Sequence, residues 1–476
     1  MFNFDYSFLS LPKKFYSLTK PSLYKNSDMF ISNDDLFNEL NLPINRKDEL
    51  LKEVLSKKNH KQSYAQAYSG HQFGYFTKLG DGRAIIIGEH ITSNKQRFDI
   101  QLKGGGRTIY SRNGDGKATL SSMLREYIIS EAMHYLNIPT SRSLAIIKTN
   151  EQIFRENIHE GGVLVRVMKS HIRVGTFENA YYYGSINDLK ALTKYTINRL
   201  FPEIKNNENP PLDLLNKVMN KQIDLVVNWM RVGFIHGVMN TDNTSLTGDS
   251  FDYGPCAFIN TYNPYQTYSS IDHNNRYAFG NQKNILKWNL SRFAESLLPV
   301  IHENKEKAIK LAQNSIDKFS DIWEKKYYGM MLKKIGIGNN HKALFPLVDE
   351  LLENMMKMNL DYTNTFTELN NDITQDKKIT NNLDFIQWHK KWKKNINKFS
   401  SINEGRNLMR KNNPIFIPRN NLVEEAIEKA VDGNQNILQK LLQVTSNPYK
   451  YQNDMDEFMK PPEKHVDECY QTYCGT

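Results

Sequence analysis

Cysteine and long apolar runs are the two features that this sequence most clearly lacks. Three cysteines in 476 residues are too few for a disulfide framework and are typical of a reducing compartment. No apolar run approaches the roughly eighteen residues that a transmembrane helix needs. The first segment, MFNFDYSFLSLPKKFYS, has neither the apolar core of a secretory signal nor the arginine-rich composition of a transit peptide. We therefore expect a globular, cytoplasmic protein with no membrane segment.

Concentrated basic charge and short metal-ligand spacings are also missing. The formal net charge is +10, but the basic residues are spread along the chain, so we interpret them mainly as a solvated surface. Nucleic-acid binding is the weaker alternative, and we expect no nucleic-acid partner. The segment WHKKWKKNINK (Trp388–Lys398) mixes aromatic and basic residues, yet its spacing predicts an amphipathic helix. Cysteines and histidines lack the spacing of a zinc site, so His236 is expected to be a core or loop histidine.

Glycines, by contrast, gather beside basic residues in two segments of the first half. In KLGDGR, Gly80 and Gly82 would let backbone N–H groups approach an anion, and Arg83 adds a fixed positive charge. A hairpin turn explains the same glycines equally well. In the second segment, three consecutive glycines (Gly104–Gly106) follow Lys103. Because glycine costs conformational entropy on folding, we interpret this cluster as space for a bound polyphosphate.

Short β-like runs dominate the first half of the chain and helical patterns the second. Strands are predicted at Ala84–Glu89, Phe98–Lys103 and Gly162–Met168, and one helix, Ser121–Leu136, interrupts them. Beyond residue 187 the pattern is mainly helical, as in Leu214–Phe234, and is broken by polar stretches at 236–275 and 370–378. Strands before helices, with a loop-rich seam between them, predict an α+β fold of two lobes around a cleft.

The strand-rich half supplies candidate cations for that cleft. Strand alternation places Lys103 on the same face as Gln101, and Glu126 in the following helix is a plausible partner, because protein kinases aim a strand lysine with a helix glutamate. The alternative is a surface lysine near an unrelated glutamate. Arg166 lies inside an apolar strand, so its guanidinium must face a cavity, a carboxylate or a phosphate. Together with Arg83 and Arg173, these cations favour a triphosphate over separate ion pairs.

The second half supplies candidate oxygen ligands. His236 precedes Asn243 by seven positions and Asp252 opens an Asp-Tyr-Gly triplet, which is the pattern of a kinase catalytic loop followed by a variant Asp-Phe-Gly. Asn243 and Asp252 suit Mg²⁺ or Mn²⁺ bound to phosphates. The position of the kinase catalytic aspartate is Val238, which accepts no proton. Asp242 is the available replacement that could orient or deprotonate a hydroxyl, and an Asx-turn or N-cap role is the alternative.

Eight segments together resemble the SelO family of kinase-like proteins, also called YdiU or UPF0061. They run in the family's order from about Tyr64 to Asn420 and are jointly specific. The segments are YSGHQFGYFTKLGDGRAIIIGE, DIQLKGGGRTIYSRNGDGKA, LREYIISEAMHYLNIPT, VLVRVMKSHIRVGTFE, GFIHGVMNTDN, DYGPCAF, DHNNRYAFGNQ and NPIFIPRN.

The resemblance implies a two-lobed protein kinase-like fold with family-specific extensions. It implies an enzyme that binds ATP in a reversed orientation with Mg²⁺ or Mn²⁺ and transfers AMP to Ser, Thr or Tyr hydroxyls of proteins. A phosphotransferase and a nucleotide-binding pseudokinase without transfer activity are the alternatives. The implied divisions are residues 1–60 as an N-terminal extension, 61–186 as a nucleotide-binding lobe, 187–460 as a helical lobe with catalytic and metal-binding loops, and 461–476 as a cysteine-containing tail.

The resemblance also assigns roles to single residues. It places the proton acceptor on Asp242, the metal ligands on Asn243 and Asp252, and the partner of the strand lysine on Glu126. Nucleotide contacts fall on Gly80, Gly82, Arg83, Lys103, Asp115, Gly116, Arg166, Arg173 and Asp252.

Cys474 matches the position at which some members of the family carry selenocysteine and others cysteine. The resemblance implies a redox-sensitive tail in which Cys474 bridges to Cys256, with Cys469 as another candidate. An inert terminal thiol is the alternative, because sequence gives no distance or pKa.

Overall fold

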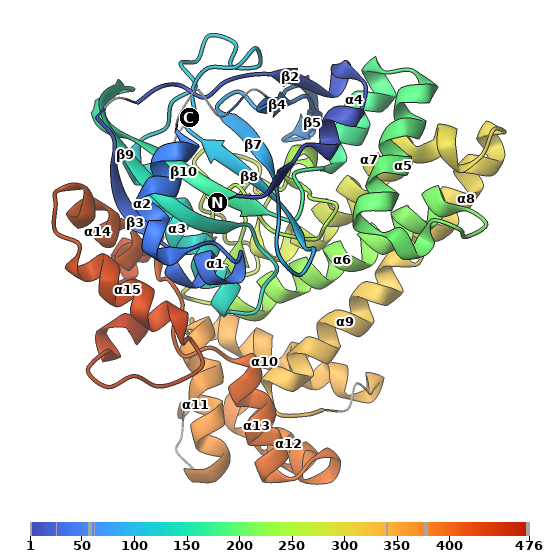
Figure 1. Cartoon of the computed structure of the whole chain (residues 1–476). Helices are drawn as coiled ribbons and strands as arrows, with labels where there is room; N and C mark the ends of the chain where they lie inside the picture. Colours follow the sequence, from blue (N-terminus) through green and yellow to red (C-terminus); the bar gives the residue numbers. More distant parts are fainter. Residues whose placement is uncertain are drawn as a thin grey trace.

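The structure is a computed structural model that describes residues 2–24, 26–55, 60, 62–338, 341–375 and 379–472. A strand-rich N-terminal part lies against a mainly helical C-terminal part (Figure 1). The prediction of strands first and helices second is therefore confirmed. No helix in the described ranges combines the length and the hydrophobicity needed to cross a membrane.

An antiparallel sheet of eight strands organises the N-terminal part. Its order is β2-β4-β7-β8-β10-β9-β3, and β1 pairs with β7. The strands are β1 (Phe4–Asp5), β2 (Tyr16–Leu18), β3 (Asp28–Ser32), β4 (Tyr64–Gln66), β7 (Ala84–Ile91), β8 (Arg97–Lys103), β9 (Arg142–Phe154) and β10 (Ile158–Met168). The three predicted strands correspond to β7, β8 and β10. The first 60 residues contribute β1, β2 and β3, which hydrogen-bond to strands from later in the chain.

Helices cover both faces of this sheet because its strands are apolar on both sides. Leu164 and Ile86 face a core shared with α3 (Leu120–Tyr135), which confirms the predicted helix to within one residue at each end. Val165 and Ile87 face a second core beneath α1 (Asp34–Glu39) and α2 (Lys47–Val54). The two-residue period of a strand thus assigns Lys103 at the end of β8 to the α3 face.

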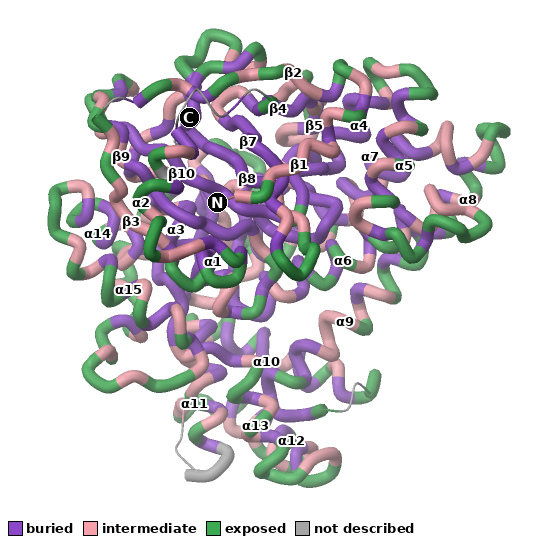
Figure 2. The backbone as a smooth tube through the Cα atoms, in the orientation of Figure 1, coloured by how far each residue is buried: buried purple, intermediate pink, exposed green. Residues whose placement is uncertain are grey.

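Helix α6 (Pro210–Val232) lies at the centre of the C-terminal part and is largely buried (Figure 2). It packs against α7 (Gln282–Ile301) and α9 (Phe319–Lys334). The Asn209 side chain caps its first turn, and Gly233, in the left-handed region at φ 77°, ends it. The neighbouring helices are α4 (Val174–Tyr183), α5 (Ile186–Leu200) and α8 (Lys305–Asp317). After α6, β11 (Phe234–Ile235) pairs with β12 (Ala257–Phe258), so this short ladder fixes both ends of the loop between them.

The remaining helices form two groups. Helices α10 (Phe345–Lys357), α11 (Tyr362–Gln375), α12 (Leu383–Phe399) and α13 (Ile402–Asn412) lie together at the bottom of Figure 1. Helices α14 (Asn420–Val431) and α15 (Asn436–Ser446) return to pack on α3, and α16 (Lys464–Cys469) follows. Residues 370–375 of the predicted polar stretch at 370–378 are helical and form the end of α11. Residues 376–378 lie outside the described ranges.

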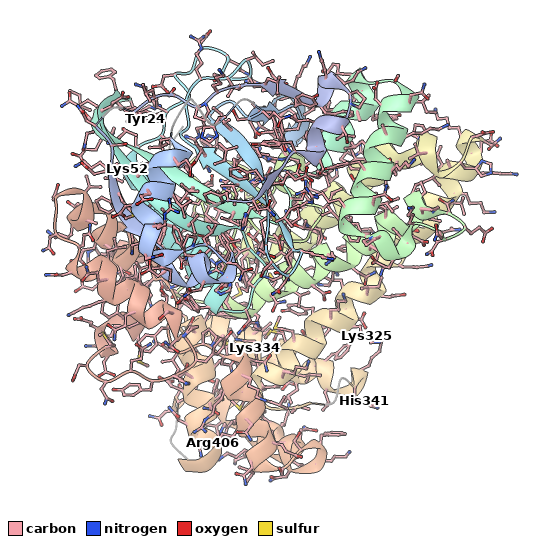
Figure 3. All side chains as sticks on the ribbon, in the orientation of Figure 1. Tyr24, Lys52, Lys325, Lys334, His341 and Arg406 are labelled. Carbon is pink, nitrogen blue, oxygen red and sulfur yellow. The ribbon has the colours of Figure 1, made fainter. Side chains whose placement is uncertain are left out.

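Buried polar contacts attach the lower helices to the rest of the chain. Lys334, at the end of α9, lies at this junction (Figure 3) and donates to the backbone oxygen of Arg231 at 2.8 Å. The indole nitrogen of Trp392 in α12 donates to the backbone oxygen of Ile335, directly after α9, at 2.7 Å. The indole nitrogen of Trp388 donates to the backbone oxygen of Leu347 in α10, within the lower group, also at 2.7 Å. Because both indoles are buried while lysines occupy the other face of α12, the predicted amphipathic helix is confirmed.

Candidate active site

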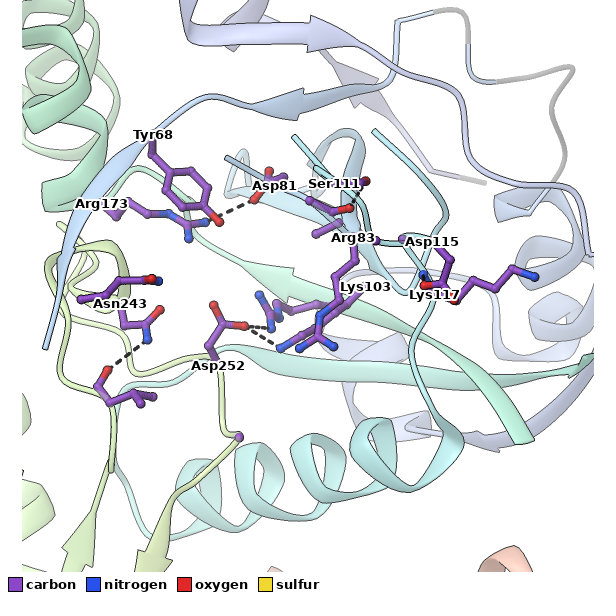
Figure 4. A pocket seen from close by; sticks show the side chains of 18 of the residues that line it. Tyr68, Asp81, Arg83, Lys103, Ser111, Asp115, Lys117, Arg173, Asn243 and Asp252 are labelled. Carbon is purple, nitrogen blue, oxygen red and sulfur yellow. Dashed lines mark hydrogen bonds and ion pairs between the residues drawn. The ribbon is translucent and has the colours of Figure 1, made fainter. Parts of the chain in front are cut away.

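A cavity of about 380 Å³ lies between the sheet and the loop that follows α6 (Figure 4). Residues from both parts of the chain line it. The predicted site residues on its wall are Gly82, Arg83, Lys103, Asp115, Gly116, Arg166, Arg173, Asn243 and Asp252. Gly80, Glu126, Asp242 and Cys256 are not on the wall. The cations expected from the first half and the oxygen donors expected from the second half therefore meet in one cavity.

Two cations and two carboxylates form the centre of the site. Lys103 Nζ lies 2.6 Å from Glu126 Oε2 and 2.6 Å from Asp252 Oδ1. Arg166 Nε donates to Glu126 Oε1 at 2.8 Å, and its Nη2 also donates to Asp252. Glu126 and the Arg166 side chain are each 2% exposed. Buried cations require counter-ions. The ion pairs therefore link α3 and the loop after α6, which carry the carboxylates, to β8 and β10, which carry the cations.

Asp252 is the least buried member of this group, with 26% of its side chain exposed. Burial by itself would raise the pKa of Asp252, but the positive charges of Arg166, Lys103 and Arg173 outweigh burial and hold the pKa well below its ordinary value. Asp252 also adopts a left-handed backbone conformation at φ 61°, which is uncommon for a residue other than glycine. The chain therefore presents an ionised carboxylate to the cavity from a strained turn.

The donor set suits a small divalent cation. The Asn243 amide nitrogen donates to the Val238 carbonyl at 3.0 Å. Asp252 Oδ1 accepts hydrogen bonds from both Lys103 and Arg166. Among the described residues, no group hydrogen-bonds to the other oxygen of Asp252 or to the amide oxygen of Asn243. Such carboxylate and amide oxygens match Mg²⁺ or Mn²⁺, which need few protein ligands because they retain water.

Asp242 lies beside the cavity. Its carboxylate is buried and its Oδ2 accepts from Gln72 Nε2 at 3.2 Å, and Gln72 does line the cavity. Within the described ranges its Oδ1 has no hydrogen-bond partner. Burial raises the pKa of Asp242 to about 7, although Arg173 opposes the shift. The N-cap position of the short turn Thr241–Asn243 is occupied by Asn240. Asp242 is therefore a carboxyl group that titrates near neutrality.

A hairpin from the first half holds the loop that carries Asp242. It consists of β5 (Ser69–Gln72) and β6 (Tyr75–Lys78). The backbone N–H of His71 donates to Thr241 Oγ1 at 2.7 Å, and its ring contacts Glu178 Oε1 at 2.6 Å. A Cβ on Gly70 would lie 2.6 Å from Asp242 Oδ1. Only glycine at position 70 allows this approach.

Residues around Arg173 were not found from the sequence. The Arg173 guanidinium lies 4.1 Å from the centre of the Tyr68 ring and 3.8 Å from Asp81 Oδ1, and it donates to the backbone oxygen of Asp242 at 3.2 Å. Asp81 is the middle residue of Gly-Asp-Gly, for which the sequence leaves both an anion-binding turn and a hairpin turn open and assigns no role to Asp81 itself. Its place between two glycines was the available signal. For Tyr68 the sequence offered no signal.

The triple glycine has a different role from the one expected. None of Gly104–Gly106 lines the cavity, so their interpretation as space for a polyphosphate is wrong. A Cβ on Gly104 would lie 2.6 Å from the Gly162 carbonyl oxygen, and the N–H of Gly106 donates to the Gly116 oxygen at 3.1 Å. Close backbone contacts therefore explain these glycines. Gly80 packs similarly beneath the Tyr110 ring, at φ 145°.

The described cysteines do not line the cavity. Cys256 is buried and burial raises its pKa to about 12, whereas Cys469 is exposed at the end of α16. Cys474 lies outside the described residues. The last described part of the tail nevertheless reaches the loop that carries Cys256, because Thr472 Oγ1 donates to the Pro255 oxygen at 2.9 Å.

The cavity has the chemistry of a nucleotide-handling transferase, with cations for phosphates and oxygen donors for a divalent ion. Comparison with known proteins agrees: a family model described as protein adenylyltransferase SelO matches residues 1–446. The chain belongs to this family, which confirms the predicted membership and makes the protein a nucleotidyltransferase.

Relatives match along nearly their whole length. The chain is 48% identical to "Protein nucleotidyltransferase YdiU" of Pelagibacter ubique (strain HTCC1062), with 100% of this chain and 99% of the relative covered. It is 46% identical to the protein of that name from Clostridium perfringens (strain SM101 / Type A), with 100% and 98% covered. It is 48% identical to the one from Bacillus cytotoxicus (strain DSM 22905 / CIP 110041 / 391-98 / NVH 391-98), with 100% and 98% covered.

Proposed function

We propose that the cavity binds ATP with Mg²⁺ or Mn²⁺ and that the enzyme transfers AMP to a Ser, Thr or Tyr hydroxyl of another protein. The observation that carries this proposal is the contact of Lys103 and Arg166 with Asp252 across the cavity. It supports one site in which phosphate-binding cations stand beside a metal-binding carboxylate. The same contacts, with Glu126 behind Lys103, support a kinase-like arrangement of the two parts of the chain.

The transfer step requires one bond to form and one to break. The acceptor hydroxyl oxygen attacks the α-phosphorus of ATP, the bond from that phosphorus to the bridging oxygen breaks, and pyrophosphate leaves. Lys103, Arg166 and Arg173 would neutralise the charge that develops on the leaving phosphates. A bound divalent ion, held by Asn243 and Asp252, would add positive charge at the phosphate oxygens. A reversed nucleotide presents its α-phosphate to the acceptor, which makes the missing aspartate at Val238 unnecessary.

Asp242 would receive the hydroxyl proton. A pKa near 7 leaves a substantial carboxylate fraction at neutral pH, and the pKa of a general base works best near the working pH. Its contact with Gln72 places it one side chain behind the cavity wall. Asp115, which pairs with Arg155 at 3.0 Å, would contact the nucleoside rather than the phosphates, because a carboxylate repels phosphate and attracts hydroxyl or amino donors.

Parallel incubations with α-labelled and γ-labelled ATP test the reaction. The enzyme, a protein mixture and Mg²⁺ or Mn²⁺ are combined, and we expect only the α-label to enter protein. Entry of the γ-label would identify a phosphotransferase instead. Nucleotide binding without transfer of either label would identify a pseudokinase. Hydrolysis of the labelled protein, followed by separation of the modified amino acids, would show whether Ser, Thr or Tyr accepts AMP.

A further inference from the structure

A second cavity, of about 560 Å³, lies where the β7–β8 hairpin and the segment after β10 meet α5 and α6. We call it the basic pocket. Its wall includes Lys95, Arg97, Lys169, Arg199 and Lys221. Among the described residues, the wall contains no acidic side chain and shares no residue with the active-site cavity. A site of this size suits a small molecule, since such cavities span roughly 300–1,000 Å³. The positive charges that a ligand would contact are those without buried counter-ions.

The two arginines already have buried counter-ions. Arg97 pairs with the buried Glu89, and also with the partly exposed Asp5 at 2.7 Å. Arg199, whose side chain is 6% exposed, pairs with Asp99 and lies 3.3 Å from Glu89. Because Glu89 and Asp99 are buried behind the wall, the arginines hold the pocket together and add little net charge to it.

The three lysines are the exposed cations of the pocket. Within the described ranges, no carboxylate is at ion-pair distance from Lys95 or Lys221. Lys169 has Asp249 at 3.9 Å, and 64% of its side chain is exposed. Two neutral donors accompany them: the side-chain amides of Gln96 and Asn198 also line the pocket, and among the described residues neither makes a hydrogen bond.

We propose that the basic pocket binds a phosphorylated small molecule. Phosphate oxygens accept strong, charge-assisted hydrogen bonds from ammonium groups. Three exposed lysines, of which only Lys169 has a carboxylate at ion-pair distance among the described residues, match the several negative charges of a phosphorylated ligand. The lysines come from different elements: Lys95 from the β7–β8 hairpin, Lys169 from the segment after β10 and Lys221 from α6. The ligand would thus contact both parts of the chain. This site is additional to the ATP site and does not depend on the proposed AMP transfer.

Inorganic tripolyphosphate is a suitable probe, titrated into the full chain by isothermal calorimetry without divalent ions. The variant Lys169→Ala/Lys221→Ala removes two of the available charges. Both side chains are exposed, so the fold should persist, and a thermal melt checks this. Lys305→Ala/Lys307→Ala, two exposed positions on α8, removes the same charge elsewhere. If the first variant fails to fold, Lys95→Asn replaces it, because asparagine tolerates the φ of 62° at that turn.

We expect the Lys169/Lys221 variant to bind one tripolyphosphate fewer than the wild type, or to bind it about tenfold or more weakly at one site. The α8 variant should match the wild type. The difference of one site holds whether or not the active-site cavity also takes the probe, so failure of the ATP assignment would not mimic failure here. Equal stoichiometry and affinity in the wild type and the Lys169/Lys221 variant would overturn the proposal. An equal loss in the α8 variant would also overturn it, because that loss would reflect net charge alone.

Discussion

Glu126→Gln is the most informative change at the centre of the site. The Glu126 carboxylate is 2% exposed and accepts from Lys103 at 2.6 Å and from Arg166 Nε at 2.8 Å. Glutamine preserves the shape and one acceptor but removes the charge, which leaves Asp252 alone to balance two buried cations. Removal of one partner from a buried ion pair costs about 3–5 kcal/mol. We expect the free energy of unfolding to fall by that amount and AMP transfer to be lost, because Lys103 is no longer held in place.

Glu131→Gln is a matched control five residues further along α3. Glu131 is also buried and pairs with an arginine, Arg142 at 2.8 Å, but on a part of the sheet that does not line the cavity. Urea unfolding followed by circular dichroism, with α-label transfer measured on the same samples, separates the two effects. Both variants should lose stability, and only Glu126→Gln should lose transfer at a temperature where both are folded.

Two results would refute this reasoning. If Glu126→Gln unfolds within about 0.5 kcal/mol of the wild type, the carboxylate is not the counter-ion that its contacts indicate, since such small changes are typical of surface sites. If Glu131→Gln abolishes transfer as completely as Glu126→Gln does, the loss reflects general damage to α3 and not the position of Lys103.

Three further predictions concern single residues. Asp242→Asn should slow transfer by about 10²–10⁴-fold while nucleotide affinity is retained. The transfer rate of the wild type should rise with pH and level off above about 7. A variant that loses nucleotide affinity without a slower transfer step would contradict the role of Asp242 as a base. The raised pKa of Asp242 means that the folded chain retains a proton that the unfolded chain releases between 3.8 and about 7. This residue therefore lowers stability as pH rises through that window, and a pH series of urea midpoints for wild type and Asp242→Asn should show the difference. Asp252→Ala should abolish metal-dependent transfer, and full activity of that variant at limiting Mn²⁺ would exclude Asp252 as a ligand. Gly116→Ala should destabilise the chain more than Gly433→Ala does, and it should weaken nucleotide binding. Both glycines have positive φ (72° and 94°), but of the two only Gly116 has backbone atoms within 2.2 Å of the position that a Cβ would take. Equal shifts of the melting temperature in the two variants would show that this clash is relieved.

Local periodicity is the reason that much of the site was predictable. Alternation along β8 places Lys103 and Gln101 on one face, and the predicted helix that follows offers Glu126 as the partner of a strand lysine. The spacing of Asn243 and Asp252 after α6 is likewise a local feature. These patterns act over a few residues and do not depend on the rest of the fold, so strands, helices and several wall residues could be inferred before any contact was known.

Long-range packing decided the rest. The sequence by itself determined which residues carry charge, which segments form strands or helices, and which family the chain resembles. Only the tertiary structure brought Arg166 against Asp252, set Asp242 behind Gln72 instead of on the wall, and used the triple glycine for backbone contacts. Each of these depends on the approach of segments far apart in the chain, where steric fit and the pairing of buried charges select one arrangement that no local pattern encodes.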